Sequence, residues 1–235
     1  MDYEKKIAKA GLKINAIKLN PNNPFTWASG FKMPIYNDNR MFLFYPSSRK
    51  LIAQGFENLL NIGEISCDIV AGTSTAGISP GTTLADLIDI PFVYVRDKPK
   101  NHGLKNQIEG IDAESDLQKK KVVLIEDLIS TGGSSARAVQ AIRDANGKCN
   151  YCFSIFNYGL DKAKKVFSGK EPYNKKGNKL KFECKVVSLL RYETLLEVAK
   201  QEKYLTNKQV KLLEEWRANP LEWGEKHGFP KVEKP

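Results

Sequence analysis

Cysteine, histidine and long apolar runs are scarce in this sequence. Its 235 residues include 4 cysteines and 2 histidines, so neither a disulfide-stapled scaffold nor a zinc site built from paired ligands is expected. No apolar run reaches the roughly 18 residues that a transmembrane helix requires. The beginning of the chain, MDYEKKIAKAGLKINAIKL, has no continuous apolar stretch of the kind that signal peptides contain. We therefore expect a cytoplasmic protein that does not associate with membranes.

Acidic residues are also fewer than basic residues. The chain carries 37 lysines and arginines against 27 aspartates and glutamates, which gives a net charge of +10 at pH 7. This excess favours anionic partners, either phosphorylated small molecules or nucleic acids, and does not choose between them. Lysines concentrate between residues 162 and 185, where Phe167, Tyr173 and Phe182 are interspersed. A solvated basic face is the simpler interpretation, and an RNA-binding face is the alternative.

Apolar runs alternate with helical patterns along most of the chain. Hydrophobic residues make up 41% and charged residues 27% of the sequence, as in ordinary globular domains. The patterns predict strands at 69–72, 91–95, 122–125, 151–156 and 184–190, helices at 2–19, 50–60, 82–88 and 134–145, and a helical tail from about 192. This order predicts an α/β fold whose mostly parallel central sheet is covered by helices. Ligands of such sheets bind beyond the carboxyl ends of the strands.

The segment VVLIEDLISTGGS at residues 122–134 carries the strongest chemical signal. Its apolar residues predict a buried strand, and Glu126 and Asp127 stand at the end of that strand. Serine, threonine and glycine then lead into a helix, where backbone N–H groups and hydroxyls bind phosphate. Carboxylates repel phosphate and suit ribose hydroxyls, or Mg²⁺ through water. The chain has no G-x-x-x-x-G-K-[ST] and no G-x-G-x-x-G after a strand, so P-loop and dinucleotide-binding folds are not supported.

This segment resembles the phosphoribosyl-pyrophosphate (PRPP) motif of the type I phosphoribosyltransferases. Three other stretches resemble sequences of the orotate phosphoribosyltransferases within that class: FTWASG at 25–30 with its continuation to residue 40, GTSTAGI at 72–78, and YVRDKPKNHG at 94–103. The PRPP motif alone points to the whole class, and the four stretches together point to the orotate family. The resemblance extends from about residue 10 to residue 191.

The resemblance implies a fold, an activity and an assembly. The fold is that of a type I phosphoribosyltransferase over residues 1–195, with a small hood at about 1–45 and a mobile loop at about 96–114, followed by a helical C-terminal extension at 196–235. The reaction converts orotate and PRPP, with Mg²⁺, to orotidine 5′-monophosphate and pyrophosphate in pyrimidine biosynthesis. The assembly is a homodimer in which the mobile loop of one subunit reaches the PRPP of the other. No nucleic acid is expected as a partner.

The resemblance also implies a role for each motif. Lys100, His102 and Asp127 are the implied catalytic residues. Orotate is implied to contact Ser130, and Tyr36 is a candidate to stack on the orotate ring, with packing in the core as the alternative; we also predict an orotate contact for Arg40. Mg²⁺ is implied to be held mainly by PRPP and water, with no direct protein ligand. The residues implied to bind PRPP are Thr73, Ser74, Thr75, Arg96, Lys98, Lys100, His102, Glu126, Asp127, Leu128, Ile129, Ser130, Thr131, Gly132, Gly133 and Ser134.

The sequence departs from the family pattern at several positions. Ala28, Ala76 and Asp97 stand where some members carry a lysine. Some members also carry an arginine for orotate in the loop after the strand that ends near Phe156, and the corresponding residues 157–162, NYGLDK, contain none. Lys32 is, besides Arg40, an alternative partner for the orotate carboxylate. Two other functions stay open: a type I phosphoribosyltransferase with another acceptor base, and a non-catalytic regulator of this fold that binds RNA.

Overall fold

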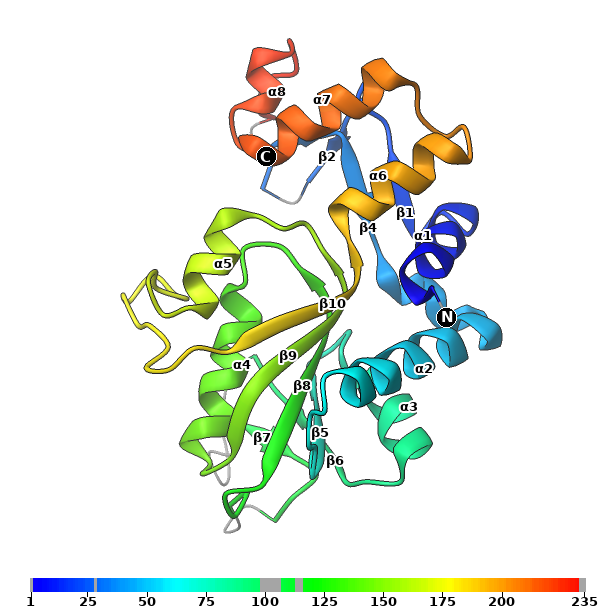
Figure 1. Cartoon of the computed structure of the whole chain (residues 1–235). Coiled ribbons are helices and arrows are strands. Elements are labelled where there is room, and N and C mark those ends of the chain that lie inside the picture. Colours follow the sequence, from blue (N-terminus) through cyan, green and yellow to red (C-terminus); the bar gives the residue numbers. More distant parts are fainter. Residues whose placement is uncertain (1, 28, 98–106, 113–115, 233–235) are drawn as a thin grey trace.

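The computed structural model describes residues 2–27, 29–97, 107–112 and 116–232. A six-stranded sheet forms the centre, in the order β10-β9-β8-β5-β6-β7 (Figure 1). Neighbouring strands from β10 to β6 run parallel, and β7 pairs antiparallel with β6. The predicted mostly parallel sheet is therefore confirmed. Its strands are β5 (Ile69–Thr73), β6 (Phe92–Val95), β7 (Ile108–Glu109), β8 (Lys121–Ile129), β9 (Lys148–Asn157) and β10 (Lys185–Arg191).

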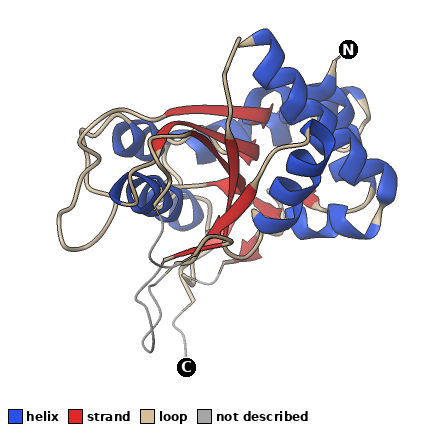
Figure 2. Ribbon diagram, turned by 90° about the horizontal axis from the view of Figure 1, so that it is seen from below, coloured by secondary structure: helices blue, strands red, loops and turns tan. Residues whose placement is uncertain are grey.

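Helices cover both faces of this sheet (Figures 1 and 2). One face carries α4 (Gly133–Asp144) and α5 (Asp161–Phe167), and the other carries α2 (Pro46–Ile62) and α3 (Ile78–Ile88). Two clusters of buried apolar side chains fill the space between the sheet and its helices. Every residue of β5 is buried, as expected for a parallel strand that is covered on both faces.

Two predictions of local structure are wrong in detail. The helix predicted at 2–19 is α1 (Tyr3–Lys13), which ends early because Asn15 has a left-handed φ of 57°. Strand β1 (Ile17–Leu19) follows and pairs with β4 (Ile35–Asn37). The strand predicted at 122–125 is part of β8, which continues to Ile129 because its pairing with β9 persists beyond the apolar run. Glu126 and Asp127 therefore lie within the strand rather than after it.

The N-terminal hood packs against the C-terminal helices. The hood contains β1, β4, the hairpin of β2 (Phe25–Thr26) and β3 (Lys32–Met33), and the 3-10 helix η1 (Asn39–Phe44). The predicted helical tail is confirmed as α6 (Tyr192–Gln201), α7 (Asn207–Ala218) and α8 (Trp223–Lys226). Both ends of the chain contribute to one apolar cluster, and near the C-terminus the backbone N–H of Val232 donates to the carbonyl of Gly30 at 2.9 Å. Helix α6 spans the boundary predicted between residues 195 and 196.

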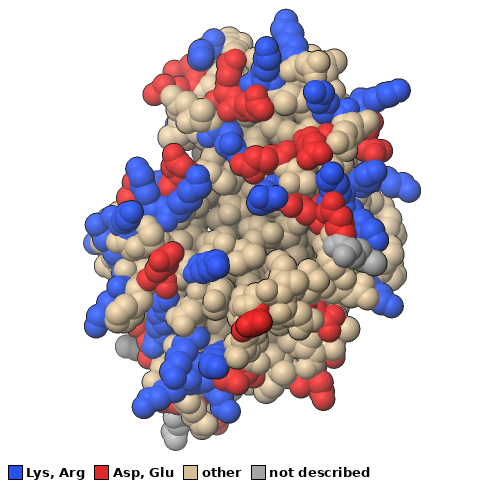
Figure 3. Space-filling model, viewed as in Figure 1, with Lys and Arg blue, Asp and Glu red and all other residues tan. Residues whose placement is uncertain are grey.

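Charge is unevenly distributed over the molecule. In the view of Figure 3, lysine and arginine side chains gather over α5 and the segment that follows it. Acidic side chains are more frequent toward the part that carries α6 and α7. Within the described ranges, no helix combines the length and the apolar character that crossing a bilayer demands.

Candidate functional site

The carboxyl ends of three parallel strands bring predicted site residues to one edge of the sheet. Thr73 ends β5 and is the register partner of Val95, which ends β6. The N–H of Ser74 donates to the carbonyl of Val95 at 2.8 Å. Beyond these strand ends, a small pocket is lined by Thr73, Ser74, Arg96 and Ser134 among others. Four residues from three separate sequence motifs therefore share one site.

Glu126 is the buried centre of this edge. Its side chain is 6% exposed. Its Oε1 accepts hydrogen bonds from the hydroxyl of Thr73 at 2.7 Å and from the N–H of Asp127 at 3.1 Å. Its Oε2 accepts from the hydroxyl of Ser135 at 2.8 Å. Glu126 thus ties the end of β5 to β8 and to the first turn of α4, and its oxygens are occupied by protein donors.

The two adjacent acids are both harder to ionise than ordinary carboxyl groups. Burial, followed by the neighbouring charge of Asp127, raises the pKa of Glu126 to about 7, against the hydrogen bonds from Thr73 and Ser135 that lower it. Burial also raises the pKa of Asp127. Of the two, Asp127 is the less buried, and its carboxyl group is therefore the better placed to meet a ligand.

The loop between β8 and α4 has a backbone conformation that depends on glycine. Gly132 precedes α4 with a φ of +79°, and a Cβ there would lie 2.9 Å from the ring of Phe167. A Cβ on Gly133 would lie 2.9 Å from the carbonyl oxygen of Tyr173. Glycine is thus needed at both positions. The N–H groups at the beginning of α4, together with the helix dipole, attract an anion at this loop.

Two site residues were not anticipated from the sequence. Ser135 is 2% exposed and holds Glu126, as described above. Arg137 donates from Nη2 to Asp97 at 2.6 Å and lines the small pocket beyond β5 and β6. Helical spacing is the sequence feature that could have identified Arg137, because Arg137 follows Gly133 by one turn of α4 and lies on the same face. The motif that carried the resemblance ends before both residues.

The segment after β6 begins with Arg96, which extends the contacts between β6 and β7 by one residue pair. Arg96 pairs through Nη1 with Oε1 of Glu109 at 3.2 Å. The Arg96 N–H donates to the carbonyl of Gln107 at 2.9 Å, and the Gln107 side chain donates to the Arg96 carbonyl at 2.8 Å. These bonds lie within the range of 96–114 predicted for the mobile loop, whose residues Ile108 and Glu109 form strand β7 and pair with β6. The predicted residues Lys98, Lys100 and His102 lie outside the described residues.

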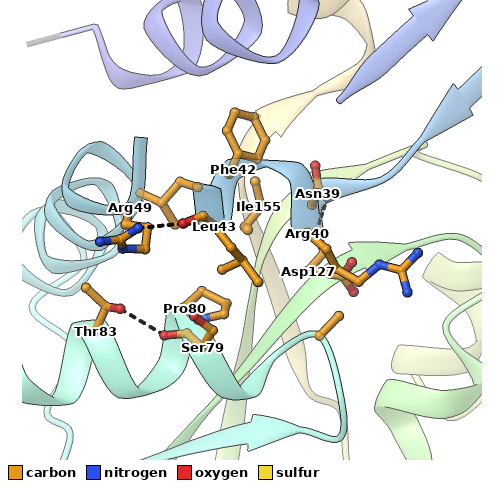
Figure 4. Close-up of a pocket in the computed structure, with 12 residues that line it drawn as sticks. Asn39, Arg40, Phe42, Leu43, Arg49, Ser79, Pro80, Thr83, Asp127 and Ile155 are labelled. Atoms are coloured by element: carbon orange, nitrogen blue, oxygen red, sulfur yellow. Dashed lines mark hydrogen bonds between the residues drawn. The ribbon is translucent and has the colours of Figure 1, made fainter. Parts of the chain in front are cut away.

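Two residues predicted to contact orotate lie apart from the largest openings. The Arg40 guanidinium forms two hydrogen bonds with Asp38, at 2.7 and 2.8 Å, which raise the pKa of Arg40 and lower the pKa of Asp38. Arg40 lies beside Asp127 at a small pocket (Figure 4). Tyr36 is 40% exposed, with its ring centroid 5.9 Å from that of Phe25. Their contact with orotate stays a prediction.

The loop at residues 130–134, which we call the phosphate loop after its predicted ligand, separates two large cavities. One, of about 820 Å³, lies between the loop, the hood and α7, and Figure 3 shows the surface hollowed in this region. Its walls include Ser130, Thr131, Trp27 and Leu160. The other, of about 900 Å³, lies between the loop, α4 and the lysine-rich segment that includes Lys175. Thr131 lines both cavities, and the volume of the first is in the range of small-molecule sites.

No ready-made metal centre accompanies these cavities. In the part of the chain that the structure describes, no group of three or more His, Cys, Asp or Glu side chains is arranged to hold an ion. The oxygens of Glu126 already accept hydrogen bonds from protein groups. Asp127 is the carboxylate left to approach a hydrated cation. The donor set fits a metal that arrives with a polyphosphate ligand and keeps most of its water.

Comparisons with known proteins agree with this geometry. The phosphoribosyl transferase domain family matches residues 43–176. Orotate phosphoribosyltransferase of Listeria innocua is 46% identical over 226 residues, which cover 95% of this chain and 100% of that protein. The UMP synthase of Leishmania donovani has a TM-score of 0.70 at 22% identity, over 92% of this chain and 42% of that one. Orotate phosphoribosyltransferase of Aeropyrum pernix has a TM-score of 0.63 at 23% identity, over 85% of this chain and 99% of that one. The two solved structures share the fold.

Proposed function

This chain belongs to the orotate phosphoribosyltransferase family, and we propose that it transfers the 5-phosphoribosyl group of PRPP to orotate with Mg²⁺ as cofactor. The reaction forms the bond between the ribose C1 and a ring nitrogen of orotate, and breaks the bond between C1 and pyrophosphate. The products are orotidine 5′-monophosphate and pyrophosphate, as in pyrimidine biosynthesis.

One observation carries this proposal more than any other. The phosphate loop at 130–134, the acids of β8 and the end of β5 meet at one edge of the sheet, and Ser130 and Thr131 open directly into the 820 Å³ cavity. A sugar whose phosphate binds to the loop can thus place its C1 between the end of β5, where Arg96 lies, and the 820 Å³ cavity.

The PRPP contacts follow from this arrangement. The loop residues Ser130 to Ser134 hold the 5′-phosphate through N–H groups and hydroxyls. Asp127 accepts hydrogen bonds from the ribose hydroxyls. Glu126 holds Thr73 and Asp127 in position, because its Oε1 accepts a hydrogen bond from each of them. The segment from Thr73 to Thr75 faces the pyrophosphate, with Leu128 and Ile129 completing the contacts of the motif.

Catalysis is proposed to act on the leaving pyrophosphate. Negative charge grows on that group as its bond to C1 loosens, so cations and N–H donors on this side lower the barrier. Arg96 begins the predicted mobile loop, and Lys98, Lys100 and His102 follow it in the sequence. Mg²⁺ bound to PRPP oxygens and water supplies further charge neutralisation. In a homodimer, Arg96, Lys100 and His102 of one subunit reach the PRPP of the partner subunit, as the family resemblance implies.

A panel of acceptor bases tests the proposal. Purified protein with PRPP and Mg²⁺ is expected to consume orotate, followed by its absorbance, and to ignore uracil and purines. Lys100→Ala is expected to abolish most of the rate, because the leaving pyrophosphate loses a cation. Lys211→Ala, at an exposed position of α7, serves as the control and is expected to behave like the wild type. Pyrophosphate release with another base alone would overturn the acceptor assignment. Tight PRPP binding without any turnover would support the regulator instead.

A further inference from the structure

Helix α7 of the C-terminal extension forms one wall of the 820 Å³ cavity. Trp216, Arg217 and Ala218 line it on that side. Ser130 and Thr131 of the phosphate loop line it on another. The extension thus faces the sugar-phosphate site directly, across a cavity large enough for a pyrimidine ring. None of the sequence motifs described above includes a residue of α7.

The end of α7 is fixed in place by an aromatic cluster. Trp216 is fully buried, with its ring centroid 6.1 Å from that of Trp27, 5.4 Å from that of Tyr158 and 5.6 Å from that of Tyr192. The indole N–H of Trp216 points to the sulfur of Met33 at 2.9 Å, and the Tyr192 hydroxyl donates to the carbonyl of Leu213 at 3.0 Å. Arg217, the next residue, therefore stands at a defined position on the cavity wall.

The Arg217 guanidinium lies close to the loop that follows β9. Its Nη1 is 3.9 Å from the position that a Cβ on Gly159 would occupy. The guanidinium carbon also lies 5.5 Å from the ring centroid of Tyr192, and Nη1 pairs with Glu193. Glu193 is 62% exposed, whereas Arg217 is 33% exposed. An arginine has five N–H donors, so this exposed partner leaves donors for a second acceptor.

Most other cations on the cavity wall are less suited to bind a carboxylate there. The guanidinium of Arg191 is paired with both oxygens of Glu4, at 3.0 Å each. Lys164 is paired with Asp161 at 2.9 Å. Lys162 lies on the exposed first turn of α5, and a lysine offers a point charge rather than a planar fork. Arg217 is the half-buried cation whose geometry matches a carboxylate.

We propose that Arg217 binds the carboxylate of the acceptor base, so that the C-terminal extension supplies the specificity of this active site. The inference rests on the proposed function, because it assigns a residue to the acceptor of that reaction. Trp27 and Leu160 provide apolar walls for the flat ring. The guanidinium supplies a charge-assisted pair of hydrogen bonds to the carboxylate. The loop at 157–162 contributes no arginine, and α7 places one beside that loop.

Steady-state kinetics of Arg217→Gln test this role. Loss of a charge-assisted hydrogen bond is expected to raise the KM for orotate by roughly 10- to 100-fold. The KM for PRPP is expected to change by less than about twofold, because the phosphate loop is untouched. Arg217→Lys is expected to recover part of the orotate affinity, since it keeps the charge. Lys211→Gln, on the same helix outside the cavity, is the matched control and is expected to be neutral.

A carboxylate-free competitor separates binding from a structural effect. The inhibition constant of uracil against orotate is expected to be the same in the wild type and in Arg217→Gln, because uracil has no carboxylate to lose. An unchanged orotate KM in Arg217→Gln would overturn the inference and leave the proposed function standing. A parallel loss of orotate, PRPP and uracil binding in Arg217→Gln would also overturn it. So would an orotate KM that rises in Lys162→Gln and stays unchanged in Arg217→Gln. Failure of the wild type to consume orotate would instead overturn the proposed function.

Discussion

Glu126 illustrates how one buried side chain organises a site through its protein partners. Its carboxylate oxygens receive donors from β5, β8 and α4, so three elements are held by one acid. Its burial lowers the stability of the folded protein when the group is ionised, because burial disfavours the charged form of a carboxyl group. The position of Glu126 in the motif could be predicted from the sequence. Its orientation could not, because Ser135 and Thr73 become its partners only in the folded chain.

The raised pKa of Glu126 predicts a pH dependence of stability. Burial raises this pKa from 4.5 to about 7. Between these values the folded protein keeps a proton that the unfolded chain releases, so the free energy of unfolding falls as pH rises through this window. The penalty is complete above pH 7 and absent below pH 4.5. The pKa of Asp127 is also raised, and its contribution has the same sign.

Glu126→Gln removes this titration and is the variant to compare. We expect the stability of the wild type relative to Glu126→Gln to fall by on the order of 2 kcal/mol between pH 4.5 and pH 7.5. Urea unfolding of both proteins across this range measures the difference directly. A difference that stays constant with pH, or grows as pH rises, would contradict the assignment of a raised pKa to Glu126.

At the scale of elements, the phosphate loop depends on glycine at the start of α4. Gly132 combines a positive φ with close approach to Phe167, so a methyl group there meets both backbone strain and a steric clash. Gly228 has a similar φ of +80° with nothing near its Cβ position. Comparing an alanine substitution at each of the two glycines therefore separates the effect of the steric clash from the effect of backbone strain.

Gly132→Ala is expected to raise the KM for PRPP by more than about tenfold, because a displaced loop loses hydrogen bonds to the 5′-phosphate. Gly228→Ala is expected to lower stability by about 1 kcal/mol and to leave the KM for PRPP unchanged. Steady-state kinetics with thermal unfolding of both variants provide the comparison. Equal effects of the two substitutions on the KM for PRPP would refute a specific role for the loop geometry.

The elements themselves were largely predictable, and their junctions were not. Apolar runs located the parallel strands, since a strand covered on both faces has a continuous apolar sequence. The same rule missed the last residues of β8, because Glu126 and Asp127 interrupt the apolar run while the backbone pairing continues. The helix after Asp2 was overextended, because Asn15 ends it through a left-handed turn. Arg217 was not predictable, since it reaches the loop at Gly159 through tertiary packing alone.

At the scale of the whole molecule, the proposal places the cations of one subunit at the PRPP of its partner. Closed twofold assemblies of this kind give each dimer two equivalent sites. A subunit that lacks a loop cation impairs the site of its partner. A subunit that lacks a ribose contact impairs its own site. Mixing them therefore distinguishes a shared site from one built within a single chain.

Co-expression of Lys100→Ala with Asp127→Asn tests this arrangement. Each variant alone is expected to be nearly inactive. If subunits combine at random, half of the dimers are mixed and each has one intact site, so we expect about a quarter of wild-type activity. Tagging one variant lets the mixed dimer be isolated and assayed by itself. Activity of the mixture no higher than that of either parent would contradict a site shared between subunits.

The most direct test of the site as a whole is a crystal structure with orotidine 5′-monophosphate. The account predicts that the 5′-phosphate rests on the loop at residues 130–134, with the ribose hydroxyls at Asp127. It further predicts that the pyrimidine lies in the 820 Å³ cavity, with its carboxylate at Arg217. A pyrimidine outside that cavity, with its carboxylate held by Arg40 or Lys32, would contradict it.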